Sequence, residues 1–260
     1  MKVAFFKYQG TGNDFVMLDN FDGRYNTLSI DAIQIICDRK LGIGADGLIK
    51  ISSSDSADFD IDYYNADGSK SFCGNGARCS VAFAHRLGKI GETTTFSAID
   101  GIHRAGLLEG IVRLEMLPVS EIQRLGDDYW MDTGSPHFIR FVHSIDQHNV
   151  VDFGRRIRYS EPFREEGVNV NLLLEKEDCI YVETYERGVE DETLSCGTGV
   201  TACALAFMDR HALTESVVRV QTKGGMLKIE AKQREAGRFS DIWLSGPAQY
   251  VFDGSIDVTV

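Results

Sequence analysis

The chain has 260 residues, with 27 Lys+Arg against 39 Asp+Glu, which gives a formal net charge of −12 at pH 7. Such an acidic surface repels phosphate backbones and anionic lipid, so nucleic acid and membrane surfaces are excluded as expected partners. A composition of 43% hydrophobic and 25% charged residues is that of an ordinary globular protein. No apolar run approaches the ~18 residues of a membrane span, and the N-terminal apolar stretch is too short for a signal peptide. We therefore expect a cytoplasmic protein.

The first half of the chain is predicted to contain short strands and two helices. Ser29 is a candidate cap for a helix over 30–39, and Gly88 a candidate end for a helix over 77–87. The dipeptide Asp100-Gly101 predicts a turn between the last two strands of this half. Apolar alternation and short apolar runs predict strands over 3–8, 15–19, 48–51, 59–63, 93–99 and 111–116.

The second half repeats this arrangement after a predicted linker at 118–128. A helix is predicted over 200–208, and its apolar residues lie on all sides, which is typical of a fully buried helix. The strand predicted over 249–252 returns to the first domain. The other strands of this half are predicted over 137–142, 169–173, 179–185, 217–222 and 227–231.

An internal duplication explains the repetition. Thr11-Gly12 resembles Thr133-Gly134 at an offset of 122, and Cys73-Gly74-Asn75-Gly76 resembles Cys196-Gly197-Thr198-Gly199 at an offset of 123. We therefore predict an α+β protein with two pseudo-symmetric domains, each a mixed β-sheet rolled around a central helix. The predicted boundaries are 1–117 plus 249–260 for the first domain and 118–248 for the second.

The six cysteines suggest neither a disulfide scaffold nor a metal site. The chain lacks a secretion signal, and no cysteine spacing matches a zinc pattern. Cys73 and Cys196 stand apart because each begins a C-G-x-G tetrapeptide before a helical run of small residues. The other four lie in apolar surroundings and are predicted to be buried structural thiols; they are Cys37, Cys79, Cys179 and Cys203.

A cysteine ahead of a helix N-terminus is suited to proton transfer. The helix dipole and the free backbone N–H groups favour thiolate, so the pKa is expected below the free value of about 8.5. Two such cysteines, related by pseudo-symmetry, suggest a cleft with a sulfur on each side of a carbon acid. For contacts of about 3–3.5 Å on each face, the sulfurs would lie roughly 6–7 Å apart. One thiolate could then remove a proton while the opposite thiol returns one, with no need for pyridoxal phosphate or another cofactor.

Six motifs identify a family resemblance that extends over essentially the whole chain. They are Gly10-Thr11-Gly12-Asn13-Asp14-Phe15, Gly42-Ile43-Gly44-Ala45-Asp46-Gly47, Asn65-Ala66-Asp67-Gly68-Ser69, Cys73-Gly74-Asn75-Gly76-Ala77-Arg78-Cys79, Tyr185-Glu186-Arg187-Gly188 and Cys196-Gly197-Thr198-Gly199. With them the chain closely resembles the diaminopimelate epimerases. The resemblance implies a cofactor-free epimerase that interconverts LL- and meso-2,6-diaminopimelate, on the route to lysine and peptidoglycan precursors. It also implies two similar α/β domains that close over a small amino-acid substrate.

The same resemblance assigns roles to individual residues. It implies that Cys73 and Cys196 are the catalytic acid–base pair and that Glu186 helps to position the reacting centre. It makes Arg187 the clamp for a substrate carboxylate, to which a guanidinium can donate two hydrogen bonds. The remaining substrate-binding residues implied are Asn13, Asn65, Asn169, Gly74, Asn75, Gly197 and Thr198. Turn formation by the first two asparagines, and a solvated Glu-Arg pair, are the structural alternatives.

The histidine His137 follows a proline, as in the family, and is implied to take part in catalysis, although packing is the alternative role. Two positions depart from the family pattern. Ser135 stands where an asparagine is common, and Gly47 where some members have a glutamine, so direct substrate contacts by these side chains are in doubt. Neither departure affects the two thiols.

Three other functions remain open at this stage. A proline or hydroxyproline racemase would share the two cysteines but would not need Arg187 for a distal carboxylate. A redox sensor with a Cys73–Cys196 disulfide would not explain the asparagines or the arginine, although apposed thiols should oxidise in air. A non-catalytic amino-acid binding protein would not need activated thiols. A homodimer is the default oligomer, but no residue pattern locates an interface.

Overall fold

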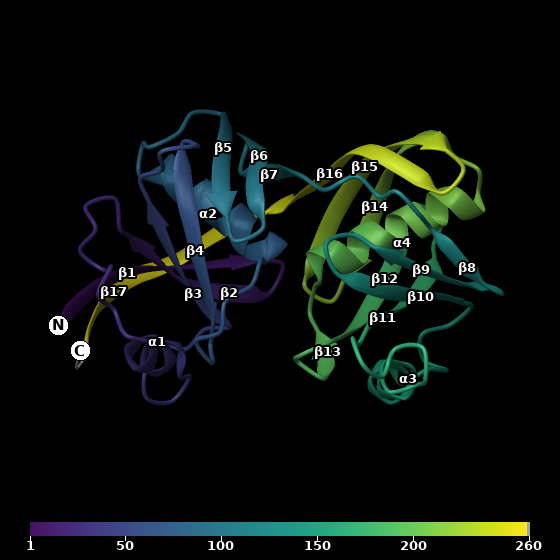
Figure 1. Cartoon of the computed structure of the whole chain (residues 1–260), viewed down its shortest axis with the longest axis horizontal. Coiled ribbons are helices and arrows are strands. Elements are labelled where there is room, and N and C mark those ends of the chain that lie inside the picture. The colour runs from purple at the N-terminus through teal and green to yellow at the C-terminus, as the bar shows by residue number, and fades with distance from the viewer. Residues whose placement is uncertain (259–260) are drawn as a thin grey trace. The chain divides into compact units, whose positions relative to one another are not determined.

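The computed structural model describes residues 1–258 and divides into two compact units (Figure 1). Unit 1 consists of Met1–Leu114 together with Gly246–Val260, and unit 2 of Glu115–Ser245. The divisions fall after residues 114 and 245, whereas the predicted boundaries lie after residues 117 and 248.

Unit 1 is a mixed sheet around one buried helix, α2 (Gly74–Arg86). A second helix, α1 (Ile30–Cys37), packs on the sheet with Ala32, Ile33 and Ile36 in the core. The strands pair in the order β17–β1–β2–β3–β4–β5–β6–β7, with β2–β3 and β4–β5 parallel and the others antiparallel. Their bounds are β1 (Lys2–Gly10), β2 (Asn13–Asp19), β3 (Gly47–Ser52), β4 (Phe59–Asn65), β5 (Thr93–Ala98), β6 (Gly101–Leu108), β7 (Ile111–Glu115) and β17 (Gln249–Asp257).

Unit 2 repeats this plan around the helix α4 (Gly197–Arg210), with α3 (Val150–Arg158) outside the sheet, against β11 and β12. The strands pair in the order β8–β9–β10–β11–β12–β14–β15–β16, with β13 on the end of β12. The pairs β10–β11 and β12–β14 are parallel, like β2–β3 and β4–β5 of unit 1. The bounds are β8 (Gln123–Leu125), β9 (Asp128–Asp132), β10 (Pro136–Val142), β11 (Asn169–Glu175), β12 (Ile180–Glu186), β13 (Asp191–Thr193), β14 (Glu215–Thr222), β15 (Gly225–Glu235) and β16 (Arg238–Pro247).

The central helices can be enclosed because their side chains are small. In α4, ten of the fourteen residues are buried, among them the run Val200–Ala206, so the sheet strands contact the helix from several sides (Figure 1). Arg78 is the exception in α2, since it is a long cationic side chain with no exposed surface. The predicted fold class, two α+β domains with mixed sheets around central helices, is confirmed.

Several predicted elements differ from the structure in their limits. The helix predicted from residue 77 begins at Gly74, because Cys73 is its N-cap. The helix predicted to residue 39 ends at Cys37, since Asp38 has extended backbone angles. The turn at Asp100-Gly101 joins β5 to β6, and not to the strand that begins at residue 111. The predicted linker at 118–128 contains β8 and a bridge between Val119 and Phe239.

The helix α3 and the strands β6, β8, β9, β13 and β16 were not predicted. The signal for α3 was a cap, since the Asn149 side chain accepts hydrogen bonds from Val151 and Asp152 N–H. A glycine inside the helix concealed it. A Cβ atom at Gly154 would lie 2.4 Å from Cβ of Tyr185, so only glycine allows the helix to pack this closely on β12.

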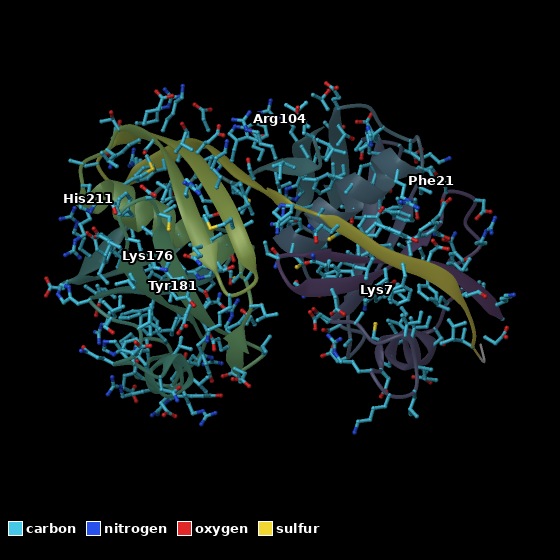
Figure 2. All side chains as sticks on the ribbon, turned by 180° about the vertical axis from the view of Figure 1, so that it is seen from behind. Lys7, Phe21, Arg104, Lys176, Tyr181 and His211 are labelled. Carbon is cyan, nitrogen blue, oxygen red and sulfur yellow. The ribbon has the colours of Figure 1, made fainter. Side chains whose placement is uncertain are left out.

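A buried ion pair lies at the start of unit 1. Lys7, labelled in Figure 2, is 6% exposed and its Nζ lies 2.8 Å from Oδ2 of Asp14. Burial alone would raise the pKa of Asp14, but hydrogen bonds from Arg39 and Lys7 outweigh it and lower the pKa to about 2.

None of the helices in the described residues, 1–258, combines the length and the apolar character that a membrane span requires.

Candidate active site

Cys73 is the N-cap of α2. Its Sγ accepts a hydrogen bond from the backbone N–H of Gly76 at 3.5 Å, and its thiol donates to Oδ1 of Asn13 at 3.5 Å. The first contact suits a thiolate and the second a thiol, so either protonation state of the sulfur has a partner. The dipole of α2 adds positive potential at the same position. These surroundings offer a partner to the sulfur before and after it loses its proton.

Asn13 reaches Cys73 because of the tight turn that precedes it. Thr11 and Gly12 have φ of 52° and 88°, as a two-residue hairpin requires, and Gly10 pairs with Asn13 across the turn. The Asn13 amide is held on both sides: its Nδ2 donates to Oδ2 of Asp46 at 2.5 Å, and its Oδ1 accepts from Nδ2 of Asn75 at 3.3 Å. Turn formation and a fixed amide beside the sulfur thus occur together at Asn13.

Asn65 ends β4, opposite Gly47 of β3. Its Oδ1 accepts from the Tyr63 hydroxyl at 2.8 Å, and its Nδ2 donates to the hydroxyls of Ser69 and Ser71 at 3.0 and 3.2 Å. The Tyr63 ring occupies the space beside Gly47, where a Cβ atom would lie 2.4 Å from Cε2 of the ring. The Tyr63 ring therefore fills the space that a side chain at position 47 would need.

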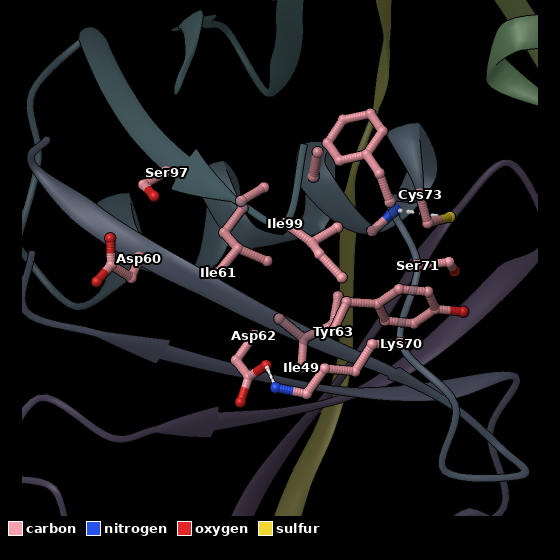
Figure 3. Close-up of a pocket in the computed structure, with 14 residues that line it drawn as sticks. Ile49, Asp60, Ile61, Asp62, Tyr63, Lys70, Ser71, Cys73, Ser97 and Ile99 are labelled. Atoms are coloured by element: carbon pink, nitrogen blue, oxygen red, sulfur yellow. Dashed lines mark hydrogen bonds and ion pairs between the residues drawn. The ribbon is translucent and has the colours of Figure 1, made fainter. Parts of the chain in front are cut away.

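A pocket of about 300 Å³ adjoins Cys73 within unit 1 (Figure 3). Its walls are largely apolar, with an ion pair between Lys70 and Asp62 on one side at 2.5 Å. In Figure 3 the sulfur of Cys73 points away from Ile61 and Ile99, although Cys73 is one of the residues that line the pocket.

In unit 2, Cys196 is the N-cap of α4 and is 9% exposed. Its Sγ lies 3.4 Å from the hydroxyl oxygen of Thr198. The Thr198 carbonyl accepts from the Thr133 hydroxyl at 2.9 Å, which ties the first turn of the helix to the loop before β10. Thr133 corresponds to Thr11 of unit 1, so the duplicated Thr-Gly turns support the two cysteine caps in different ways.

His137 is fully buried beneath Thr198, with Nε2 at 2.9 Å from the Thr198 hydroxyl. Its ring orientation follows from Asn171, whose Nδ2 donates to the carbonyl of Phe138 at 3.0 Å and to Nδ1 of His137 at 3.1 Å. Oδ1 of Asn171 accepts from the Thr184 hydroxyl at 2.8 Å. Because Nδ1 accepts, the neutral ring carries its proton on Nε2 and donates to Thr198, whose own hydrogen can point at the sulfur.

The protonation state of His137 follows from its environment. Burial, together with the positive charge of Arg187, lowers the pKa of the ring to about 3, against the opposing effect of the hydrogen bond with Asn171. The imidazole is therefore neutral at physiological pH.

The remaining implied residues of unit 2 gather at the adjoining strand ends. Asn169 donates through Nδ2 to the Ser135 hydroxyl at 2.8 Å and accepts through Oδ1 from the backbone N–H of Arg187 at 2.9 Å. Ser135 thus contacts Asn169. The Arg187 guanidinium donates to the carbonyl of Glu166 at 2.7 Å and is half-buried, as is Glu186 at the end of β12.

Within each unit, the structure therefore brings together the residues that the sequence motifs singled out. Gly74 and Gly197 are the first residues of the two central helices and are buried, next to the half-buried cap Cys73 and the buried cap Cys196. The residues that sequence reasoning missed support these groups; they are Thr11, Asp46, Tyr63 and Arg78 in unit 1, and Thr133, Asn171 and Thr184 in unit 2. Asp46 and Arg78 lie inside the recognised motifs, and Asn171 lies two residues after Asn169, on the same strand face.

Three of the other cysteines differ from Cys73 and Cys196 in their surroundings. Burial raises the pKa of Cys37 and of Cys79 to about 12, and it raises that of Cys203 well above its ordinary value. These thiols are expected to be unreactive. Among residues 1–258, no group of three or more His, Cys, Asp and Glu side chains is placed to hold a metal ion.

Comparisons with known proteins agree with this geometry. The family model described as diaminopimelate epimerase matches residues 5–104 and 129–251. A diaminopimelate epimerase of Flavobacterium psychrophilum is 44% identical over 98% of this chain and 100% of its own length. That of Chlorobaculum tepidum is 41% identical over 95% and 98%, and that of Aquifex aeolicus is 36% identical over 99% and 99%.

Solved structures share the fold at low sequence identity. A PhzF-family phenazine biosynthesis protein of Bacillus anthracis has a TM-score of 0.77 at 14% identity, over 99% of this chain and 100% of its own. A probable proline racemase of Agrobacterium radiobacter has a TM-score of 0.69 at 14% identity, over 99% and 93%. These structures support the architecture alone, whereas the family model and the relatives in sequence identify the chain as a member of the diaminopimelate epimerase family.

Proposed function

We propose that this protein interconverts LL-2,6-diaminopimelate and meso-2,6-diaminopimelate by a two-cysteine acid–base mechanism, in the synthesis of lysine and peptidoglycan precursors. The observation that carries the proposal is that each unit places a C-G-x-G cysteine at the N-cap of its central helix, beside amide or hydroxyl groups. The relatives in sequence are named for the same substrate.

The reaction needs no cofactor. The thiolate of one cysteine removes the α-proton of the substrate and becomes a thiol, while the electron pair of the broken C–H bond delocalises into the substrate carboxylate. The thiol of the other cysteine gives its proton to the opposite face of the α-carbon and becomes a thiolate. One proton leaves and one arrives, so the substrate is inverted and the two cysteines exchange protonation states. The mechanism requires the two sulfurs to face opposite sides of the α-carbon.

The residues around the sulfurs suit the charges of an amino acid. The N–H groups at the start of α2 and α4 stabilise the negative charge that develops on the reacting carboxylate. Asn13, Asn65 and Asn169 offer both donors and acceptors to ammonium and carboxylate groups. Arg187 would exchange its contact with the Glu166 carbonyl for the distal carboxylate, and Glu186 would help to position the reacting centre.

His137 is proposed to act through Thr198. Since the ring is fully buried, it reaches Cys196 by way of the Thr198 hydroxyl, whose hydrogen it directs toward the sulfur. A hydroxyl hydrogen bond stabilises the thiolate of Cys196 more than its thiol. The histidine is then a positioning residue, with Asn171 and Thr184 behind it.

Proton NMR of LL-diaminopimelate with the reduced protein in D2O tests the function. We expect the α-proton signal to disappear as the meso isomer forms. Exchange with proline but not with diaminopimelate would retain the two-thiol chemistry and move the substrate to a cyclic amino acid. Exchange with neither would refute the proposed reaction.

Oxidation tests the pair of thiols separately. We expect activity to be lost as a Cys73–Cys196 disulfide forms in air and to return with a reductant. Full activity with that disulfide intact, verified by mass spectrometry, would overturn the two-base mechanism. A cytoplasmic location and a homodimer remain predictions, and light scattering of the purified protein tests the latter.

A further inference from the structure

Arg78 is a buried cation without an anionic partner. It has no exposed surface, and among the described residues no carboxylate pairs with it. Its Nη2 donates to Oγ1 of Thr11 at 3.1 Å and to Oδ1 of Asn75 at 2.9 Å, while Nε and Nη1 are buried without a hydrogen-bond partner. An arginine is almost never fully buried unless it is paired, so this guanidinium calls for a functional explanation.

A chain of hydrogen bonds connects Arg78 to Cys73 through the side chains of Asn75 and Asn13. Arginine has donors alone, so the Asn75 atom that it contacts is Oδ1, and Nδ2 of Asn75 faces Oδ1 of Asn13 at 3.3 Å. At the other end, the carboxylate of Asp46 has acceptors alone, so it contacts Nδ2 of Asn13 at 2.5 Å. The two amides between the cation and the carboxylate are thereby fixed in orientation. The Cys73 sulfur lies 3.5 Å from Oδ1 of Asn13, in the middle of this chain of hydrogen bonds.

Charge is the second link between Arg78 and Cys73. Burial lowers the pKa of the Arg78 guanidinium, and thiolates at Cys79 and Cys73 would each counteract that shift. Burial raises the pKa of Cys79 to about 12, so Cys79 stays a thiol. Cys73 is half-buried and caps the N-terminus of the same helix, which makes it the anion that the cation can stabilise.

Other charged groups around Cys73 are worse placed for this role. Lys70 is 45% exposed and paired with Asp62, and Asp46 is held by Arg39 and Asn13. Within unit 1 the titratable groups on the elements around Cys73 are Arg78 and Cys79 on α2 and Asp46 behind Asn13. Those beside the pocket are Asp60, Asp62, Tyr63 and Lys70. Of these, Arg78 combines a positive charge with complete burial.

We propose that Arg78 is a positioning residue of the Cys73 half-site, a buried counter-cation that favours the Cys73 thiolate and fixes the Asn75 and Asn13 amides beside it. The inference deepens the proposed function, on which it rests for the use of the thiolate. Unit 2 solves the same problem differently, because the position equivalent to Arg78, five residues after the cysteine, is Thr201. Its hydroxyl donates to the carbonyl of Gly197 in its own helix.

Alkylation by iodoacetamide tests the proposal without substrate. The full chain is labelled under reducing-agent-free conditions from pH 5 to pH 9, and mass spectrometry follows each cysteine separately. For the unmodified sequence we expect an apparent pKa of Cys73 below the free value of about 8.5. A value at or above 8.5 would overturn the proposal even if no variant could be prepared.

The variants Arg78→Gln and Arg78→Lys separate charge from shape. Arg78→Gln keeps a donor for Asn75 but removes the charge, so we expect the apparent pKa of Cys73 to rise by about one unit, with about tenfold slower labelling at pH 7. Arg78→Lys keeps the charge and is expected to stay within about threefold of the unmodified rate. Equal labelling of both variants at the unmodified rate, or equal loss in both, would overturn the role of the charge.

Three internal controls make the result specific. Cys196 should label at its unmodified rate in both variants, and the buried Cys79 and Cys203 should stay protected, which reports intact folding. Thr201→Val, at the matched position of α4, should leave the Cys73 profile unchanged. Because the readout needs no substrate, the NMR experiment can fail while the alkylation result stands, and the reverse.

Discussion

In both units a cysteine caps the central helix, but the residues beneath the first turn of that helix, here called its floor, differ. In unit 1, the first turn of α2 lies on Phe15 and Ile49, whereas in unit 2 the first turn of α4 lies on His137 and Asn171. The strand registers make these residues equivalent, because Phe15 pairs with Gly47 as His137 pairs with Asn169, at the start of the parallel strand pair in each unit. Duplication thus kept the backbone and changed the chemistry beneath the cysteine.

This difference shows that the two cysteines are supported by different groups. Unit 1 combines an apolar floor with the buried charge of Arg78 inside the helix. Unit 2 has the uncharged Thr201 at the position equivalent to Arg78 and a polar floor of hydrogen bonds. Both arrangements favour a thiolate, through the charge of Arg78 at Cys73 and through the Thr198 hydroxyl at Cys196.

The largest expected effect comes from the caps themselves. Cys73→Ser and Cys196→Ser should each lower kcat by about 10³-fold, because a serine hydroxyl is too weak an acid to replace either proton carrier. The measurement is the epimerisation rate from LL-diaminopimelate, with circular dichroism to verify the fold. Cys79→Ala and Cys203→Ala, at buried thiols in the same two helices, are the controls and should keep nearly normal rates. More than a tenth of normal activity in either serine variant would require another base.

The floor of unit 2 gives the next effect. His137→Phe installs the residue of unit 1 and removes the donor to Thr198, so Cys196 loses a directed hydrogen bond. Hydrogen bonds to charged groups contribute about 1.5–3 kcal/mol, which corresponds to a loss of about 10- to 100-fold in kcat. The rate of alkylation at pH 7 should fall at Cys196 and stay constant at Cys73. An equal change at both cysteines would show that the histidine does not act through Thr198.

The features that could be predicted from the sequence are those that depend on neighbouring residues in the chain. Strands such as β1, β4 and β10 were predicted because apolar alternation and short apolar runs are local signals, and the cap at Ser29 because it precedes an apolar helical run. Cys73 was expected ahead of a helix, but the helix was predicted to begin only at residue 77. The glycines of the two C-G-x-G motifs marked the cysteine sites because they too are a local pattern. What remained hidden depends on pairing and burial: the supporting role of Asn171 requires the register of β10 and β11, and that of Arg78 requires its enclosure within the sheet. Neither property is visible in a single sequence.

Alanine substitutions at Gly76 and Gly199 test how easily the residues beneath each helix can move to make room for a methyl group. A Cβ atom at Gly76 would lie 2.9 Å from the flexible end of Ile49, whereas one at Gly199 would lie 2.7 Å from Oδ1 of Asn171, which Thr184 holds by a hydrogen bond. Gly76→Ala should therefore be nearly neutral, since a small shift of Ile49 is offset by a helix-propensity gain of about 1 kcal/mol. Gly199→Ala should lower the free energy of unfolding by about 1–3 kcal/mol. Urea denaturation of both variants measures the difference, and equal stabilities would contradict a rigid floor in unit 2.

The smallest effect is a dependence of stability on pH that comes from His137. Unit 1 has no such effect at the equivalent position, because Phe15 does not titrate. His137 has a pKa of about 3 in the folded protein, against an ordinary value of about 6.5, so between these values the unfolded chain binds a proton that the folded chain does not. This contribution is complete above pH 6.5 and is lost as the pH falls, by about 1.4 kcal/mol at pH 5.5. Asp14, whose pKa is lowered to about 2, loses its own contribution in a more acidic window, below about pH 4. The denaturation midpoint of the unmodified protein should consequently fall between pH 7 and pH 5.5 by more than that of His137→Phe, in which the position cannot titrate. Parallel pH profiles for the two proteins would mean that His137 is protonated as readily in the folded state as in the unfolded chain. The ring would then not be held neutral, and the direction of its hydrogen bond to Thr198 would no longer be fixed.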